Sequence, residues 1–236
     1  MSAMPLLLAE PAAHALAWSA ATIALYVGAK RIHRRWPRWW LMPLLVTPVL
    51  LGALLLALHA SYRDYIDGTG WLALLLGPAT VAFALPIYEQ RALIRRHWPV
   101  LLVGMIVGSF TAIATSWGLA TLVGIDGAMR LSLLPRSIST PFALAVSGDI
   151  GGLPDLTAIF VIITGVAGAV LGDLILARLP IASAMARGAL FGIGAHGAGT
   201  ARASQIGETE GAVAGLVMVL VGLMNVLVAT LAVRLL

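Results

Sequence analysis

The sequence predicts an all-α polytopic membrane protein with about six transmembrane helices, plus two broken or re-entrant helical elements in a transporter-like inverted repeat. The 236 residues are 60% hydrophobic and only 11% charged, whereas soluble domains carry about 25% charged residues. The apolar residues form long runs separated by short polar segments. Two of these segments are rich in Gly, Ser, Thr and Pro, which interrupt a helix without ending the apolar region.

Six apolar segments are long enough to cross a bilayer. Along the chain they are 12–29, 41–60, 71–88, 99–123, 156–179 and 211–236. The fourth has a small-residue face, Gly104 and Gly108, that suits close helix packing. We expect a single integral membrane domain in three parts, namely N-terminal spans in 12–98, a first repeat unit in 99–152 and a second in 156–236.

The basic residues predict the orientation, because cytoplasmic loops carry the excess of Lys and Arg. Ten of the 15 basic residues fall on one side of this scheme, with five in 30–38, three in 91–96, and Arg178 and Arg187. These loops are therefore expected to be cytoplasmic in a bacterial inner membrane, with both termini periplasmic and residues 61–70 forming an outer loop. The first loop also holds three tryptophans, so it can equally be a patch that binds anionic lipid.

Residues 134–143 are expected to form a helix that stops, opens its backbone and restarts. Pro135 cannot continue the incoming helix, and Pro141 suits the first position of the next. A restarted helix presents free N–H groups, and Arg136 beside them adds a positive charge, so the break is a seat for a small anion. The hydroxyl residues of this seat are Ser137, Ser139 and Thr140. The alternative is an ordinary turn, in which the hydroxyls only cap the helix and Arg136 extends to the interface.

Residues 194–203 are expected to form a second break that repeats the parts of the first, with His196 aligned to Arg136. Glycine supplies the backbone freedom here. If both breaks dip into the bilayer and return, the repeat is inverted and the breaks meet near the midplane, where secondary transporters bind substrate. If both cross instead, Arg178 and Arg187 fall on the outer side. His196 can alternatively be a structural histidine that hydrogen-bonds between helices.

The predicted substrate-binding residues are Arg136, Ser137, Ser139, Thr140, His196, Gly197, Gly199 and Thr200, with Thr80 and Asn225 as secondary candidates. Asn225 suits a hydrogen bond between helices better than a contact with a ligand, and Asp173 is expected to pair with Arg178. The histidines are scattered, so no metal site is expected, and no cofactor is implied. No G-x-S-x-G, HExxH or Walker-type motif occurs, which argues against an enzyme. Nucleic acid is not an expected partner, because the basic residues lie in short loops between spans.

Four motifs, in the same order, resemble the LrgB/CidB family. They are Gly77-Pro78-Ala79-Thr80-Val81-Ala82, Arg136-Ser137-Ile138-Ser139-Thr140-Pro141, Ile150-Gly151-Gly152 through Phe160-Val161, and His196-Gly197-Ala198-Gly199-Thr200-Ala201-Arg202-Ala203. The resemblance covers Trp71 to the C-terminus, whereas the residues before it align only loosely. Bacterial members are labelled antiholin-like proteins or regulators of murein hydrolase export, and the plastidal glycolate/glycerate translocator is similar in its C-terminal half.

The resemblance implies two functions. One is a carrier for small monocarboxylates of the glycolate, glycerate, lactate or pyruvate type, with the anion at the two breaks and proton or cation coupling as an option. The other is a holin- or antiholin-like regulator of murein hydrolase export and cell lysis. The residues favour the carrier, because a holin needs oligomerising helices and no anion seat. A small LrgA/CidA-like membrane protein and a second copy of the chain in a homodimer are the expected protein partners.

Overall fold

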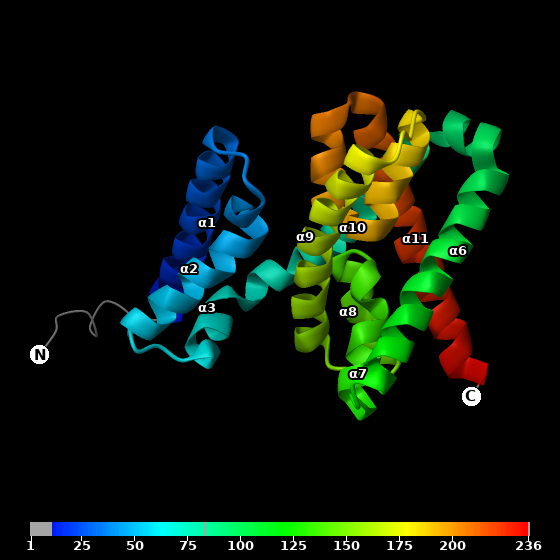
Figure 1. The fold of residues 1–236 in the computed structure, drawn as a ribbon. Helices are drawn as coiled ribbons and strands as arrows, with labels where there is room; N and C mark the ends of the chain where they lie inside the picture. Colours follow the sequence, from blue (N-terminus) through cyan, green and yellow to red (C-terminus); the bar gives the residue numbers. More distant parts are fainter. Residues whose placement is uncertain (1–10, 83, 236) are drawn as a thin grey trace, which may run out of the picture. The chain divides into compact units, whose positions relative to one another are not determined.

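The computed structural model describes residues 11–82 and 84–235. These residues are almost entirely helical and contain no strand, so the predicted all-α fold is confirmed (Figure 1). The chain forms two compact units, Met1–Ala79 and Thr80–Leu236. Three helical segments within the described residues have the length and composition of a membrane span: Arg91–Leu122, Pro154–Arg178 and Glu208–Leu231. A fourth, Tyr62–Glu89, meets the same criteria but includes residue 83, which lies outside the described residues. The second predicted span corresponds to a shorter apolar helix, Pro43–Ala57.

The N-terminal unit holds α1 (Pro11–Arg35), η1 (Trp39–Leu41), α2 (Pro43–Ala57) and α3 (Tyr62–Leu74), and α4 (Leu76–Ala82) begins at its end. Helices α1 and α3 are joined by polar contacts around the buried residue Ser19. Its hydroxyl donates to the carbonyl of Gly68 at 3.3 Å and accepts from Nε1 of Trp71 at 2.8 Å. These contacts fix α1 against α3 inside an otherwise apolar pair of helices.

Two boundaries in this unit differ from the prediction. Helix α1 continues through Arg35, because Lys and Arg are good helix formers and are favourable near the negative end of the helix dipole. The predicted loop 61–70 is helical, because Ser61 and Asp64 form a capping box that starts α3. The Ser61 hydroxyl accepts from the Asp64 N–H at 3.1 Å, and the Asp64 carboxylate accepts from the Ser61 N–H at 2.8 Å.

The second unit contains α5 (Ala84–Glu89), α6 (Arg91–Leu122), α7 (Gly127–Leu133), η2 (Leu134–Ser137), α8 (Thr140–Asp149), α9 (Pro154–Arg178), α10 (Ala184–Ile206) and α11 (Glu208–Leu235). Helix α6 includes the predicted loop 91–97 and bends at His97, two residues before Pro99. A Cβ on Gly108 would lie 2.7 Å from Ile193 of α10, whereas one on Gly104 would meet nothing within 4 Å. The predicted small-residue contact is therefore made by Gly108 alone.

The segment from α7 through η2 and the helix α8 form a hairpin, here called the first hairpin, in which η2 contacts both α7 and α8 and lies toward the tip. Ser132 of α7 and Ser147 of α8 both reach the same side chain of α9, Thr157. The Oγ1 atom of Thr157 lies 3.0 Å from the carbonyl oxygen of Ser132 and 2.7 Å from Oγ of Ser147. All three residues are fully buried, so these hydroxyls anchor the base of the hairpin to α9.

Replacing Thr157 with valine is expected to destabilise the protein by about 1–3 kcal/mol, because the Ser147 hydroxyl and the Ser132 carbonyl lose a partner in a buried position. Thermal unfolding of the purified protein in detergent measures the effect. Thr157→Ser keeps the hydroxyl and serves as the control. A valine variant that unfolds at the same temperature as the serine variant would show that the network does not anchor the hairpin.

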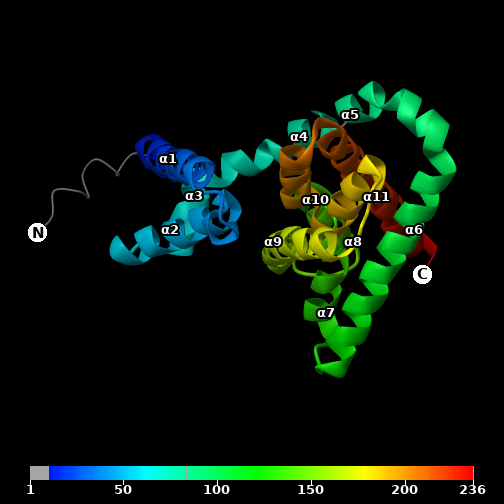
Figure 2. The ribbon, with the colours of Figure 1, turned by 45° about the horizontal axis from the view of Figure 1, so that its top comes forward.

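Helix α10 also folds back on itself, at His196, and its two limbs form the second hairpin. A Cβ built on Gly199 would overlap the main-chain oxygen of Phe191, eight residues earlier, which places the two limbs side by side. Both limbs lie against the start of α11, through Gly192 on the first limb and Ser204 on the second. Two views show α10 between α9 and α11 (Figures 1 and 2).

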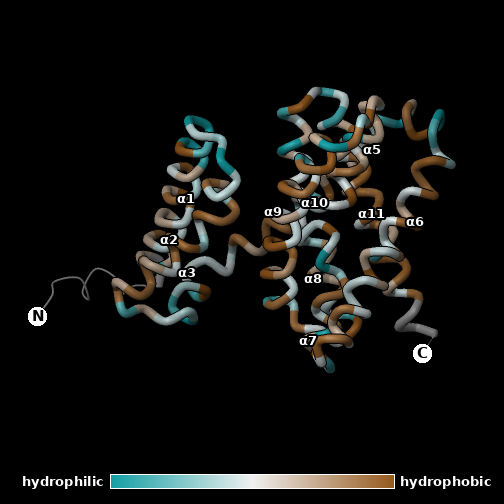
Figure 3. The backbone as a smooth tube through the Cα atoms, in the orientation of Figure 1, coloured by the Kyte–Doolittle hydropathy of each residue, from teal (hydrophilic) through white to brown (hydrophobic). Residues whose placement is uncertain are grey.

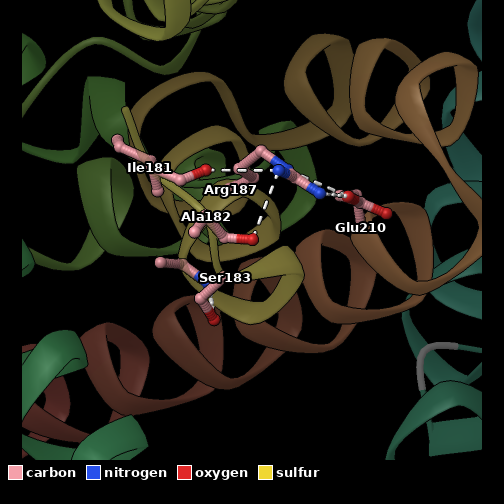
Figure 4. A network of polar contacts seen from close by, with 6 residues as sticks. Ile181, Ala182, Ser183, Arg187 and Glu210 are labelled. Atoms are coloured by element: carbon pink, nitrogen blue, oxygen red, sulfur yellow. Dashed lines mark hydrogen bonds and ion pairs between the residues drawn. The ribbon is translucent and has the colours of Figure 1, made fainter. Parts of the chain in front are cut away.

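Ion pairs hold both limbs of the second hairpin. Arg187 on the first limb donates from Nε to Glu210 of α11 at 3.0 Å, and from Nη1 to the carbonyl of Ile181 at 3.2 Å (Figure 4). Arg202 on the second limb donates from Nε to the carboxylate of Asp173 on α9 at 2.8 Å. The partner of Asp173 is therefore Arg202 and not the predicted Arg178, because the fold-back brings the second limb beside α9.

Candidate functional site

The tips of the two hairpins meet beside the middle of α9. Along α9, Thr157 contacts the base of the first hairpin, and Thr164 contacts its tip at Arg136. The next residue, Gly165, contacts the tip of the second hairpin at His196, and Asp173 contacts a limb of that hairpin. The hairpins therefore approach each other from opposite ends of one helix, as an inverted repeat requires.

Arg136, at the tip of the first hairpin, is partly buried and bound by two hydroxyl groups. Its Nε donates to Oγ of Ser116 on α6 at 2.8 Å, and its Nη1 donates to Oγ1 of Thr164 at 3.2 Å. Neither ion pair formed by the described residues involves it. Hydroxyl groups satisfy hydrogen bonds but leave the positive charge in place, so this guanidinium remains able to attract an anion.

His196, at the tip of the second hairpin, lies against the first break. Its imidazole ring is within hydrogen-bonding range of the main-chain carbonyl of Arg136, and only 3% of the residue is exposed. The Nε2 atom is buried and has no hydrogen-bond partner among the described residues. A buried polar atom without a partner is rare and costly, so Nε2 is a candidate contact for a ligand.

The backbone at His196 is in a conformation that favours glycine, with φ 36° and ψ −119°. Such a conformation costs about 1–3 kcal/mol in a residue with a side chain and is concentrated at functional sites. The neighbouring Gly165 gives the imidazole its space, since a Cβ there would lie 2.8 Å from the ring carbon Cε1. The position of the His196 imidazole therefore depends on a strained backbone in α10 and on the absence of a side chain at Gly165 of α9.

A pocket lies beside the tip of the first hairpin. Four elements line it: α6, the break at η2, α10 and α11. Its polar residues are Ser109, Ser137 and Asn225, and its other lining residues are Gly108, Ala112, Ile113, Leu134, Pro135, Ile138, Ile193 and Val221. The Asn225 side chain donates to Oγ of Ser109 at 2.9 Å and to the carbonyl of Val221 at 2.8 Å. Asn225 therefore links α11 to α6 beside this pocket, whose lining includes Ser137 but neither Arg136 nor His196.

The other predicted hydroxyl residues differ in burial and in hydrogen bonding. Ser139 is buried, makes no side-chain cap and has an unpartnered Oγ, which resembles the situation of His196 Nε2. Thr140 is half-buried at the start of α8. Thr200 donates to the carbonyl of His196 at 3.0 Å, so its hydroxyl stabilises the break.

The two predicted glycines differ in what surrounds them. Gly199 permits the close approach of the limbs, whereas a Cβ on Gly197 would meet nothing within 4 Å. Thr80 lies on α4 and does not line the pocket.

Two residues of the site, Ser116 and Thr164, were not predicted. Each is a single hydroxyl inside a long apolar helix, where such residues often hydrogen-bond only their own backbone. Ser116 does donate to the carbonyl of Ala112 at 2.7 Å in addition to accepting from Arg136. The only sequence signal is the presence of hydroxyl residues in the apolar spans on either side of Arg136.

The geometry suits a small anion with one or two further hydrogen-bonding groups. Arg136 supplies positive charge and a planar set of donors, which matches a carboxylate. His196 and Ser139 supply buried polar atoms that no described residue hydrogen-bonds. Among the described residues, no group of His, Asp and Glu side chains could hold a metal ion.

Comparison with known proteins identifies similar sequences over most of the chain. A sequence model of the LrgB-like family matches residues 22–235. The chain is 38% identical over 208 residues to "Uncharacterized protein YwbG" of Bacillus subtilis, which covers 88% of this chain and 92% of that protein. It is 36% identical over 193 residues to "Antiholin-like protein LrgB" of Bacillus subtilis, with 82% and 84% covered. It is 33% identical over 186 residues to the protein of the same name in Bacillus mycoides, with 79% and 81% covered. No solved structure matches the chain.

Proposed function

The chain belongs to the LrgB-like family, and from this premise we propose two membrane functions, a carrier for small monocarboxylates and an antiholin-like regulator. The names of the curated relatives favour the regulator, which the resemblance to the LrgB/CidB family implies as the alternative. The geometry of the site favours the carrier. The two are compatible if movement of an organic anion changes the state of the cell envelope.

One observation supports the carrier most directly: Arg136 sits where two hairpin tips meet, bound to hydroxyls and not to a carboxylate. Secondary transporters place substrate between broken helices that face each other across an inverted repeat. In this proposal the carboxylate binds Arg136, and a hydroxyl or keto group of the substrate meets His196 or Ser139. The rest of a short chain would lie in the pocket beside η2.

Uptake into liposomes that contain this protein alone tests the proposal. Radiolabelled glycolate, glycerate, lactate and pyruvate are expected to enter by a saturable process, and unlabelled short carboxylates are expected to compete. Encapsulated dyes of graded size report a pore in the same vesicles. Dye leakage without saturable uptake would overturn the carrier and leave the regulator.

For the antiholin-like function, the proposal is that the chain regulates murein hydrolase export together with a small LrgA/CidA-like membrane protein. Its support is the shared family and the names of the relatives. In this case Arg136 and His196 would fix the structure of the hairpins without binding a solute. The test is a deletion strain of the native host, complemented with either the wild type or Arg136→Ala. The autolysis of these strains, compared with that of the uncomplemented deletion, separates the two roles.

We also propose that the basic segments are cytoplasmic in a bacterial inner membrane. The chain has no cysteine, so single cysteines report their side of the membrane cleanly. Arg95→Cys, in the first turns of α6, is expected to react with a membrane-impermeant maleimide only after the membrane is opened. Asp126→Cys, beyond the other end of α6, is expected to react in spheroplasts. The reverse pattern would invert the proposed orientation.

A further inference from the structure

Neither proposed function uses the basic and aromatic segment that joins α1 to α2. We call residues 30–40 the basic–aromatic surface. Its five cationic residues, Lys30, Arg31, Arg34, Arg35 and Arg38, are all exposed. Trp36, Trp39 and Trp40 are 55%, 52% and 48% exposed. Figure 3 shows hydrophilic residues gathered at this end of α1, next to helices that are largely apolar.

The chain does not neutralise this charge. Between Glu10 and Asp64 the sequence contains no acidic residue, so no carboxylate lies near the surface in sequence. Both ion pairs that the described residues form belong to the second hairpin. Five cations on a short segment therefore form no ion pair among the described residues and are free to attract an anion from outside the chain.

The aromatic rings hold the guanidinium groups. The Arg38 guanidinium lies 5.1 Å from the centre of the Trp40 ring, and that of Arg35 lies 5.8 Å from the Trp36 ring. Trp39 and Trp40 pack edge to face with their centres 5.6 Å apart. A guanidinium that stacks on a ring keeps its in-plane N–H groups free for an oxygen ligand, and phosphate is the ligand that fits them in pairs.

We propose that the basic–aromatic surface binds the headgroups of anionic phospholipids. Tryptophan favours the headgroup level of a bilayer, and clustered Lys and Arg beside a membrane helix attract anionic lipid. The apolar helix α2 follows this surface directly in the chain, which would hold the surface at the headgroup level of a bilayer. Phosphatidylcholine has no net charge to offer, so phosphatidylglycerol is expected to bind in preference to it. A segment that served only to orient the chain during insertion would show no such preference in the folded protein.

Quenching of tryptophan fluorescence by brominated phosphatidylglycerol and brominated phosphatidylcholine tests the proposal on the full-length protein in detergent. We expect the wild type to favour phosphatidylglycerol by about fivefold or more, and to lose most of the preference in about 1 M salt. Arg35→Gln with Arg38→Gln is expected to lower the preference about fivefold. The control is Arg95→Gln with Arg96→Gln, an equal charge change at two exposed arginines of the other basic segment.

Three results would overturn the proposal. The first is equal quenching of the wild type by both lipids. The second is an Arg35 and Arg38 variant that keeps the wild-type preference. The third is a control variant that loses the preference to the same extent. Folding does not confound the comparison, because all four substituted side chains are exposed.

Discussion

Arg136→Ala is expected to lower carboxylate uptake about a hundredfold while the protein still inserts and folds. The guanidinium is the one positive charge at the meeting point of the hairpins that is bound only by hydroxyls among the described residues. Losing a charged hydrogen-bonding partner in a partly dry site costs about 3 kcal/mol, which corresponds to about two factors of ten in rate. Initial uptake rates in liposomes, normalised to folded protein, measure the effect.

Two variants make the result specific. Arg136→Lys keeps the charge but cannot reproduce the fork that spans Ser116, Thr164 and a carboxylate, so we expect it to recover little activity. Arg130→Ala removes a charge from the same hairpin, where the guanidinium stacks over Trp117 at 4.1 Å, and should transport like the wild type. If Arg136→Ala takes up carboxylates at the wild-type rate, the anion must bind at a site other than Arg136. Equal loss in Arg130→Ala would indicate damage to the hairpin.

Gly168→Ala is expected to be among the most destabilising single-atom additions in the chain. A Cβ on Gly168 of α9 would overlap the main-chain oxygen of Gly194, just before the second break, and lie 3.0 Å from Cβ of Ala195. A main-chain carbonyl cannot move away as a flexible side chain can, so the two helices must separate. We expect a loss of about 3 kcal/mol, at the upper end of what overpacking usually costs.

Gly104→Ala is the matched control, because a Cβ there meets nothing within 4 Å and alanine favours helix by about 0.5–1 kcal/mol. Thermal unfolding in the same detergent compares the two variants. The control is expected to unfold at or slightly above the wild-type temperature, and Gly168→Ala well below it. Similar midpoints for both would mean that α9 and α10 do not pack as closely as the structure shows.

The two breaks could be predicted from local sequence because their causes are local. Pro135 stands where α7 gives way to η2 and Pro141 stands at the start of α8, two positions that suit proline. The glycines around His196 permit a sharp reversal. The start of α3 was predictable in principle from Ser61 and Asp64, but the polar residues after them were interpreted as a loop. The polarity of residues 30–35 predicts a loop after residue 29, whereas their helix propensity predicts the continuation of α1 through Arg35 that the structure has.

The contacts between distant segments could not be predicted in this way. Ser116 lies 20 residues before Arg136 and Thr164 lies 28 residues after it, and no local pattern marks either as a partner. Their role follows from the fold-back of the first hairpin, which carries Arg136 between α6 and α9. The pairing of Asp173 with Arg202 has the same origin. Sequence periodicity describes one helix at a time, whereas these contacts depend on which helices become neighbours.

The backbone at His196 has a consequence for the history of this position. Glycine would adopt φ 36° there without strain, and glycines already stand at 194 and 197. Selection for stability alone would therefore favour glycine over histidine at position 196. A histidine that other members of the family kept at this position would therefore contribute something that offsets its conformational cost. If related sequences also carry histidine at this position, that would indicate selection for the imidazole side chain. The comparison needs only their sequences and no further structure.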